Sequence, residues 1–415
     1  MASDASGNVE RRAGSSGWRW ALAGIIVFGV AIRVGLGLVH PYMFDDSRDY
    51  VELARRIVHG LSYGVQTRDG WMTASRMPGY PVFLAGVFAV FGESVKAVAC
   101  VQAILSGGII WLTWLIGRRA GVMAGLIAAG LVAMDPLTVG FSAAILSEMP
   151  FTLCLMGGMW IGARLLERER GEVRELGWWI VLGLVWGAGV YLRASVLYAL
   201  VVVGVWIWGY RRFSGWALGG ALLAVVVMFG TLVPWMMHTG KGAGRLTSLE
   251  GISLYEAVYP GADGGPKQDK IATPPEMEGA GMEWPRDEVW GREAWGYVRS
   301  DPVRILRLAV VKAGRTWSPW MNASEMRNPV LQAVLIGWQA PLFILAAGGI
   351  FWGGLAGRMK GLLLCPIVYF TAVHALFLGS VRYRVPLMPV VCVLAATGLA
   401  RLVRRAGKPE PDEGV

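Results

Sequence analysis

The sequence predicts an all-α, polytopic membrane protein with about ten transmembrane helices. Of its 415 residues, 55% are hydrophobic and only 16% are charged, whereas soluble globular proteins carry about a quarter charged residues. The apolar residues occur in runs, and several runs exceed the ~18 residues that mark a membrane-spanning helix. This pattern excludes a disordered chain, a coiled coil and an ordinary cytosolic enzyme. The formal net charge of +10 is first a topology signal in such a protein, and we expect no nucleic-acid partner.

The amino-terminal segment sets the orientation of the first span. Residues 1–17 are polar and include Arg11 and Arg12, and they lack a signal-peptide cleavage pattern before the first apolar run. We therefore expect a cytoplasmic tail over residues 1–17 and a first span over residues 18–39. Because positive charge favours the cytoplasmic side, this span ends on the extracytoplasmic side.

The later spans alternate across the membrane, and arginine-rich turns mark their cytoplasmic ends. The expected spans are residues 94–117, 120–141, 150–163, 176–192, 195–210, 213–237, 329–357, 362–379 and 387–402. Both termini are then cytoplasmic in the inner (plasma) membrane. The expected organisation is a core module (18–237) with a first outer loop (40–93), an extracytoplasmic loop (238–328), carboxy-terminal spans (329–403) and a cytoplasmic tail (404–415).

Two further helices are expected on the outer side. Residues 78–91 are apolar, but ~14 residues are too few to span comfortably, so we predict a re-entrant or interfacial helix there. In residues 301–317, apolar positions alternate with four cations at helical spacing, and Pro302 suits a first helical turn. This pattern predicts an amphipathic helix on the outer membrane surface.

The outer face carries acids and bases beside apolar helix ends, where topology does not explain them. Asp45 and Asp46 follow the first span. They could be an N-cap and a first-turn acid of a surface helix, or a general base whose pKa a neighbouring charge and partial desolvation would raise. Glu148, before Met149-Pro150, could likewise cap a helix, but an acid between apolar helices is costly and therefore a functional candidate.

Several arginines complete this set. Arg76, just before the short outer helix, is either a snorkelling interfacial side chain or a phosphate ligand. Arg193 and the pair Arg382 and Arg384 also lie on the outer side, where the positive-inside rule does not explain them. Acids and arginines on one outer face suit a reaction between an anionic lipid headgroup and a nucleophile that must lose a proton. His374 is isolated in the sequence and is expected to be structural.

The chain resembles the GT-C glycosyltransferases, in particular the bacterial relatives of dolichyl-phosphate-mannose–protein mannosyltransferases and the lipid A aminoarabinose transferases. The ordered motifs that carry the resemblance are FDDSRDYVELARRIVHGLSYG, SRMPGYPVFLAGVFAVFG, AAILSEMPFTLCLM, GVYLRASVL, TGKGAGRLTSLEGISLYEAVYPGADG and RYRVPLMPV. They cover most of the chain. The resemblance implies a GT-C-like helix bundle and an inverting membrane transferase that takes a sugar from a polyprenyl-phosphate donor on the extracytoplasmic side.

The resemblance also implies roles for individual residues. The acids fall on Asp45, with Asp46 beside it, and on Glu148. The arginine near the donor falls on Arg48, and the cation that contacts the phosphate falls on Arg76. Our further candidates for contacts to the lipid phosphate and sugar are Tyr80, Arg193, Arg382, Tyr383 and Arg384. In this hypothesis Asp45 takes the proton of the acceptor hydroxyl, and Arg76 stabilises the departing lipid phosphate.

Other interpretations stay open at this point. The acceptor could be a lipid, a glycan or a protein. A secondary transporter or lipid-linked-sugar flippase is the competing class, and a non-catalytic scaffold is a third. Asp45, Asp46 and Glu148 could hold a divalent cation, although no ligand spacing demands one. The four cysteines lie in apolar runs without CxxC spacing, and we interpret them as buried apolar residues.

Overall fold

The chain is a multi-pass membrane protein, here described from a computed structural model that covers residues 3–67, 70–167, 173–240, 245–266, 271, 282–322 and 328–406. Within these ranges, eight helices are long and apolar enough to cross a membrane, or nine if the bent pair α5 and α6 is one span. The only paired strands among the described residues are β1 and β2, so the all-α prediction is confirmed. Most of the tail predicted over residues 404–415 lies outside the described residues.

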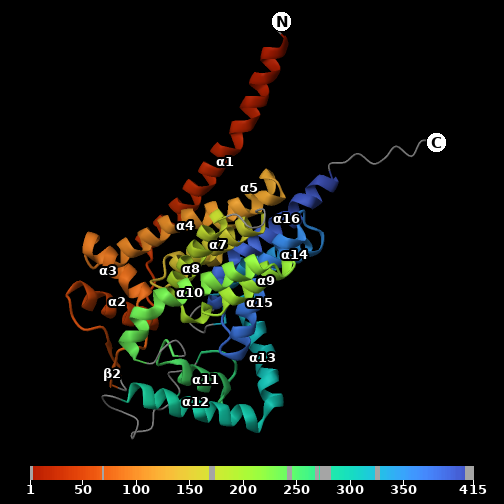
Figure 1. The fold of residues 1–415 in the computed structure, drawn as a ribbon. Helices are drawn as coiled ribbons and strands as arrows, with labels where there is room; N and C mark the ends of the chain where they lie inside the picture. Colours follow the sequence, from red (N-terminus) through yellow and green to blue (C-terminus); the bar gives the residue numbers. More distant parts are fainter. Residues whose placement is uncertain are drawn as a thin grey trace.

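The first helix, α1, is longer than predicted. It runs from Ser3 to Val39, and its apolar part covers Gly17–Val39. Figure 1 shows its amino-terminal part projecting beyond the rest of the bundle. The expected tail before residue 18 is therefore helical from Ser3 onward.

The first outer loop holds a surface helix, a hairpin and the short apolar helix. Their bounds are α2 Asp45–Val58, β1 Val65–Thr67, β2 Gly70–Met72 and α3 Gly79–Phe91. The 13 residues of α3 are too few to span, as predicted. Gly79 is required at its start, because a Cβ there would come within 2.5 Å of the Tyr191 carbonyl oxygen at the end of α8. This close contact brings the segment just before α3 against the bundle.

The helices that follow form the first part of the bundle. They are α4 Val95–Gly117, α5 Val122–Met134, α6 Pro136–Ser142, α7 Glu148–Glu167, α8 Val173–Leu192, α9 Ala199–Tyr210 and α10 Gly215–Thr239. Between α5 and α6 the chain bends by 54°. Asp135 caps α6 there by accepting a hydrogen bond from the Thr138 amide (2.9 Å), and Pro136 occupies the first turn.

The predicted span over residues 195–210 is shorter than expected. Its helix α9 has 12 residues and is preceded by the 3₁₀ turn η2, Ala194–Val196, so it falls below the length of the other spans. Arg211, directly after α9, nevertheless forms an ion pair with Glu175 in the first turn of α8. The end of α9 therefore lies beside the start of α8, as expected of two antiparallel segments that cross the same layer.

The long loop that follows α10 has three helices among its described residues. It contains α11 Glu250–Val258, α12 Glu283–Ser300 and α13 Pro302–Trp317, which lie together at the end of the molecule opposite the amino terminus (Figure 1). The amphipathic helix predicted over residues 301–317 is present as α13, with Asp301 as its cap (Arg304 N to Oδ1, 2.9 Å). It also packs beside α15, since the Trp317 indole donates to Thr371 Oγ1 at 2.9 Å.

This loop is tied to the first outer loop by one carboxylate. Glu283, at the start of α12, accepts hydrogen bonds from the Thr73 and Ala74 amides (2.9 and 2.8 Å) and from the Ser248 hydroxyl (2.5 Å). The hairpin and the α11–α12 segment are thereby held in fixed positions above the bundle.

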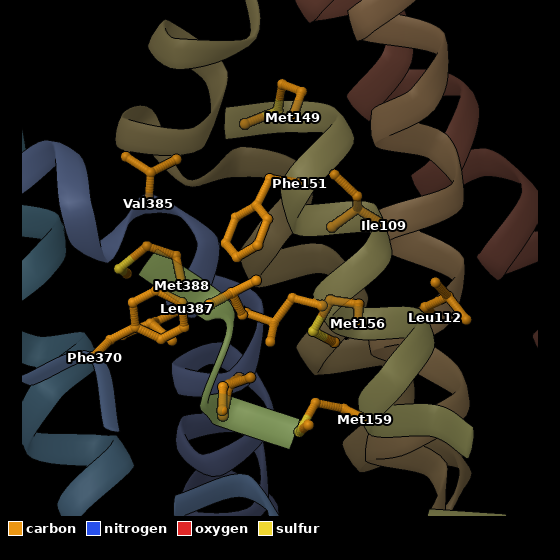
Figure 2. Packing of buried hydrophobic residues seen from close by; sticks show 14 of the residues in the cluster. Ile109, Leu112, Met149, Phe151, Met156, Met159, Phe370, Val385, Leu387 and Met388 are labelled. Carbon is orange, nitrogen blue, oxygen red and sulfur yellow. The ribbon is translucent and has the colours of Figure 1, made fainter. Parts of the chain in front are cut away.

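The remaining helices complete the core. They are α14 Pro329–Trp352, α15 Gly357–Leu376, the 3₁₀ segment η6 Val381–Leu387 and α16 Met388–Ala406. In Figure 2, side chains of α4, α7, α15, η6 and α16 interlock in one apolar layer. Phe151 and Phe370 meet edge to face there, with ring centroids 5.9 Å apart. This packed layer supports the start of α7, the end of α15 and η6, which carry or flank the site residues.

Candidate active site

Three carboxylates and three arginines meet where the outer loops join the bundle. Each comes from the end of an element or from a connecting segment, so five distant parts of the chain converge. The acids are Asp46 and Asp49 on α2 and Glu148 at the start of α7; the bases are Arg76 before α3, Arg193 after α8 and Arg382 on η6.

Asp46 links two of the arginines. Its Oδ1 accepts from Arg76 Nη2 at 2.7 Å, and its Oδ2 accepts from Arg382 Nη1 at 2.6 Å. Arg76 is also bound to Asp49 Oδ2 through Nε (3.1 Å) and Nη2 (2.9 Å), and its carbonyl oxygen accepts from the Tyr63 hydroxyl at 2.9 Å. Arg76 is therefore fixed on both its side chain and its backbone.

Glu148 forms the buried end of the cluster. Its side chain is 0% exposed, and its Oε1 accepts from Arg193 Nη2 at 2.8 Å and from Arg382 Nε. Arg382 therefore bridges Asp46 and Glu148. A buried carboxylate needs such charged partners, because an unpaired buried charge is strongly unfavourable.

The cluster holds Asp46 in the charged form, so the raised pKa expected from the sequence for a general base in this pair of acids is wrong for Asp46. Burial alone would raise the pKa of Asp46, but the positive charges of Arg76 and Arg382 outweigh burial and hold the pKa well below its usual range. For the same reason, Asp46 and Asp49 outweigh the burial that would lower the pKa of Arg76, and that pKa is raised. Both groups are therefore ionised at every physiological pH.

A cavity of about 440 Å³ opens beside this cluster. One wall is polar and includes Asp46, Arg76, Arg193 and Arg382. The other wall is apolar or aromatic and comes from the α8–α9 connection and α15: Leu192, Ala194, Leu197, Tyr198, Tyr369, Val373, Phe377 and Leu378. The cavity thus has the character of a site for an amphiphilic molecule.

Three polar side chains on this cavity have unused hydrogen-bonding atoms. Within the described part of the chain, Arg193 Nη1, Ser195 Oγ and both ring nitrogens of His374 are buried and have no hydrogen-bond partner. The His374 ring is held parallel to Tyr383, with centroids 4.1 Å apart and an interplanar angle of 1°. Buried polar groups are normally paired, so this convergence indicates a site for an absent polar ligand.

The structure separates the predicted site residues into two groups. Asp46, Arg76, Arg193, Arg382 and Tyr383 line the cavity, with Glu148 directly behind them. Tyr80 is buried and donates to Gln102 Oε1 at 2.9 Å, and its ring meets that of Tyr50, which also lines the cavity.

The other predicted residues lie elsewhere. Asp45 and Arg48 are exposed and are absent from the cavity wall. Since the N-cap of α2 is Phe44, Asp45 and Asp46 both belong to the first helical turn. Arg384 is buried on the other side of η6 and donates to the carbonyl oxygens of Thr316 (2.9 Å) and Ser318.

Asp49 and Ser195 were not singled out from the sequence, and His374, which was expected to be structural, lies on the cavity wall. Asp49 lies three residues after Asp46 on one helix, a spacing that places both on one face and could have revealed it. Ser195 and His374 carry no local signal, because only the packing of α8 and α15 brings them together.

The carboxylates do not fit a divalent cation. Among the described residues, no group of three His, Cys, Asp or Glu side chains is placed to hold a metal. Asp46 is bound by two arginines, one on each oxygen, and Glu148 is bound by two arginines on Oε1, so a divalent cation would meet two positive charges at either carboxylate. Asp45 is exposed. The four cysteines are not disulfide-bonded.

Comparison with known proteins finds similarity to proteins whose descriptions name sugar transfer. Residues 75–238, less than half of the chain, match the family model described as dolichyl-phosphate-mannose-protein mannosyltransferase. A curated relative from Pseudomonas fluorescens, undecaprenyl phosphate-alpha-4-amino-4-deoxy-L-arabinose arabinosyl transferase 1, is 25% identical over 228 residues, which are 53% of this chain and 39% of the relative.

Solved structures share the architecture. The oligosaccharyltransferase of Archaeoglobus fulgidus in its apo form has a TM-score of 0.58 at 12% identity, over 94% of this chain and 51% of that chain. The same archaeal enzyme in complex with an inhibitory peptide and a dolichol-phosphate has a TM-score of 0.56 at 16% identity, over 94% and 52%. The chain thus spans about half the length of these enzymes and less of the curated relative. The predicted resemblance is confirmed, and the chain has the fold of the GT-C superfamily of membrane glycosyltransferases.

Proposed function

We propose that this protein is an inverting glycosyltransferase that moves a sugar from a polyprenyl-phosphate donor to an extracytoplasmic acceptor. The observation that carries the proposal is the cavity itself. It combines an apolar wall, three buried polar groups without partners and an ionised carboxylate within one space of about 440 Å³. A lipid-linked phosphosugar needs each of these features.

In this proposal the donor phosphate binds at Arg193. Arg76 and Arg382 each bridge two carboxylates, whereas Arg193 gives one nitrogen to Glu148 and leaves Nη1 without a partner at the cavity. Guanidinium groups bind phosphate oxygens strongly. Ser195 Oγ and a ring nitrogen of His374 supply two further hydrogen bonds.

The lipid chain then follows the apolar wall. The apolar wall includes Val373 on α15, Phe377 just after α15 and Tyr198 just before α9. Tyr198 is 61% exposed at the bundle surface. A polyprenyl chain could leave the cavity there into the surrounding lipid without exposing its apolar surface to water.

The reaction requires a proton acceptor on the other side of the sugar. We assign this role to Asp46, which lies on the cavity wall, rather than to the exposed Asp45 that the resemblance implies. The acceptor oxygen forms a bond to the anomeric carbon while the bond from that carbon to the phosphate oxygen breaks. The proton passes to Asp46 as the attacking hydroxyl becomes acidic, and the electron pair leaves on the phosphate. Attack from the face opposite the phosphate inverts the anomeric centre.

The expected location is the outer face of the inner membrane. The cluster lies at the ends of the spans opposite to the arginine-rich turns that contain Arg118, Arg119, Arg211 and Arg212. By the positive-inside rule those turns are cytoplasmic, so the cavity opens to the extracytoplasmic side.

Binding of undecaprenyl phosphate to the purified protein in nanodiscs tests the phosphate site. Arg193→Gln should weaken binding by about 10- to 100-fold, as expected when a hydrogen bond to a charged group is lost. Arg48→Gln is the matched control, because Arg48 is exposed and outside the cavity wall, and should bind as the unmodified protein does. Equal binding by Arg193→Gln, with unchanged thermal stability, would contradict the assignment.

A further inference from the structure

A second, smaller cavity lies beside the first, on the side away from the apolar wall. Its volume is about 160 Å³, and it is enclosed by α2, the hairpin, α11 and α12. Ser75, Arg76 and Leu249 line both cavities. Arg76 therefore forms part of the partition, with Asp46 on the first cavity and Asp49 on the second.

The second cavity contains an unused hydrogen-bond donor on an aromatic side chain. Trp290 of α12 is only 4% exposed, and its indole Nε1 has no partner among the described residues. The ring is held against Tyr255, with centroids 4.4 Å apart. Because indole N–H groups are usually paired when buried, a ligand atom that accepts from Trp290 Nε1 would complete the pairing of this side chain.

The charges around this cavity balance. Asp49 and Asp287 face Arg76 and Arg286 on its wall. The two aspartates are already engaged: Asp49 binds Arg76, and Asp287 accepts from the Gly251 amide at 2.6 Å and from Arg245 at 2.7 Å. A balanced, hydrogen-bonding wall favours a neutral hydroxylated ligand over an anion.

The volume of the second cavity limits the size of the ligand. Pockets that enclose drug-sized molecules measure about 300–1,000 Å³, so a volume of about 160 Å³ suits a single ring. The wall mixes apolar residues (Met72, Leu249 and Ile252) with hydroxyl groups and charged side chains. Such a mixed wall suits a hydroxylated ring better than an acyl chain, which has no polar groups to pair with it.

We propose that the second cavity is the acceptor subsite and that it binds a sugar ring, the terminal residue of a glycan or glycolipid. This inference rests on the proposed transferase function, because it places the acceptor hydroxyl next to Arg76. Arg76 also binds Asp46 on the first cavity, so an acceptor in the second cavity is separated from the proposed base by one side chain, which would have to move aside for transfer. The donor and the acceptor would thus enter from opposite sides of one arginine.

Saturation-transfer NMR with methyl glycosides tests the subsite on the full chain in nanodiscs. The probes are the methyl α-glycosides of glucose, mannose and galactose at millimolar concentration. Trp290→Phe keeps the aromatic packing and removes the N–H group, so the dissociation constant of the bound glycoside should rise by about 3- to 10-fold. Trp295→Phe is the matched control, because Trp295 lies on the same helix, is 53% exposed and lines neither cavity.

Undecaprenyl phosphate binding, measured on the same samples, separates this inference from the proposed function. We expect both variants to bind the lipid as the unmodified protein does. The subsite is refuted if no glycoside binds, or if Trp290→Phe binds it as well as the unmodified protein. Trp290-dependent binding of a serine-containing peptide instead of the glycosides would also overturn the sugar assignment. If the unmodified protein does not bind undecaprenyl phosphate, the transferase function is contradicted. The glycoside measurement still decides separately whether the second cavity binds a sugar ring.

Discussion

Replacing Asp46 by asparagine should abolish sugar transfer and leave the lipid-phosphate site intact. The substitution keeps the size of the side chain and one carbonyl oxygen that can still accept from Arg382 or Arg76. It removes the proton acceptor. General-base catalysis contributes about 10²–10⁴ to the rate, so kcat should fall by roughly that factor.

The structure also predicts what this substitution spares. Arg76 keeps its contacts with Asp49, and Arg382 keeps Glu148, so each arginine retains one carboxylate partner. The cluster of three acids and three arginines changes from neutral to a net charge of +1. Binding of undecaprenyl phosphate should therefore be unchanged or tighter while turnover is lost.

The assay is release of undecaprenyl phosphate from labelled undecaprenyl-phosphate sugars, with binding of the free lipid phosphate measured in parallel. Asp45→Asn is the matched control: the neighbouring acid is exposed and outside the cavity, so its rate should stay within about twofold of the unmodified protein. The reasoning is refuted if Asp46→Asn retains turnover within tenfold, or if Asp45→Asn loses as much activity as Asp46→Asn.

Three further outcomes are expected. His374→Phe should preserve thermal stability, since the ring still stacks on Tyr383 and no hydrogen bond is lost, but should weaken undecaprenyl phosphate binding by about 3- to 10-fold; unchanged binding would remove His374 from the phosphate site. The difference in free energy of unfolding between the unmodified protein and Asp46→Asn should be constant from about pH 5 to pH 8. The lowered pKa of Asp46 stabilises the fold at every pH above the pKa of the unfolded chain, about 3.9, and this stabilisation is lost only as the pH falls through the pKa of the folded protein. A chemical-denaturation series in which the difference shrinks above pH 5 would contradict the ion-pair geometry. Glu175→Gln, far from the site, should lower the free energy of unfolding by about 3–5 kcal/mol, because Arg211 loses a buried carboxylate partner. A melting curve indistinguishable from that of the unmodified protein would show that this ion pair does not hold α8 against α9.

Much of the bundle could be predicted from the sequence because lipid imposes simple rules on the chain. Apolar runs of sufficient length must be helical, and arginines mark the cytoplasmic turns. The short helix α3 followed from its length alone, and α13 followed from its alternating apolar and basic residues. The length of α9 differed because the 3₁₀ turn at Ala194–Val196 takes up part of that segment.

The site was only partly predictable because its residues meet through tertiary packing. Charge on the outer face pointed to Asp46, Arg76, Glu148, Arg193 and Arg382, all of which join the cluster. The sequence could not tell which of two adjacent aspartates turns inward, since the helical phase of α2 decides this.

The role of each arginine also needed the structure. Arg382 and Arg384 are two positions apart, and the 3₁₀ geometry of η6 sends them to opposite sides. His374 lies beside Arg193 on the cavity wall only because α15 packs there, and the sequence does not indicate that its ring nitrogens are unpaired.

The most direct test of the central claim is turnover of the donor by the purified protein. Incubation in nanodiscs with a panel of labelled undecaprenyl-phosphate sugars and methyl glycosides as acceptors should release undecaprenyl phosphate and form a glycoside of inverted anomeric configuration. The Asp46→Asn protein should release undecaprenyl phosphate at least about 100-fold more slowly. Absence of release from every donor in the panel, together with no measurable binding of undecaprenyl phosphate, would contradict the assignment of this cavity to lipid-linked sugar transfer.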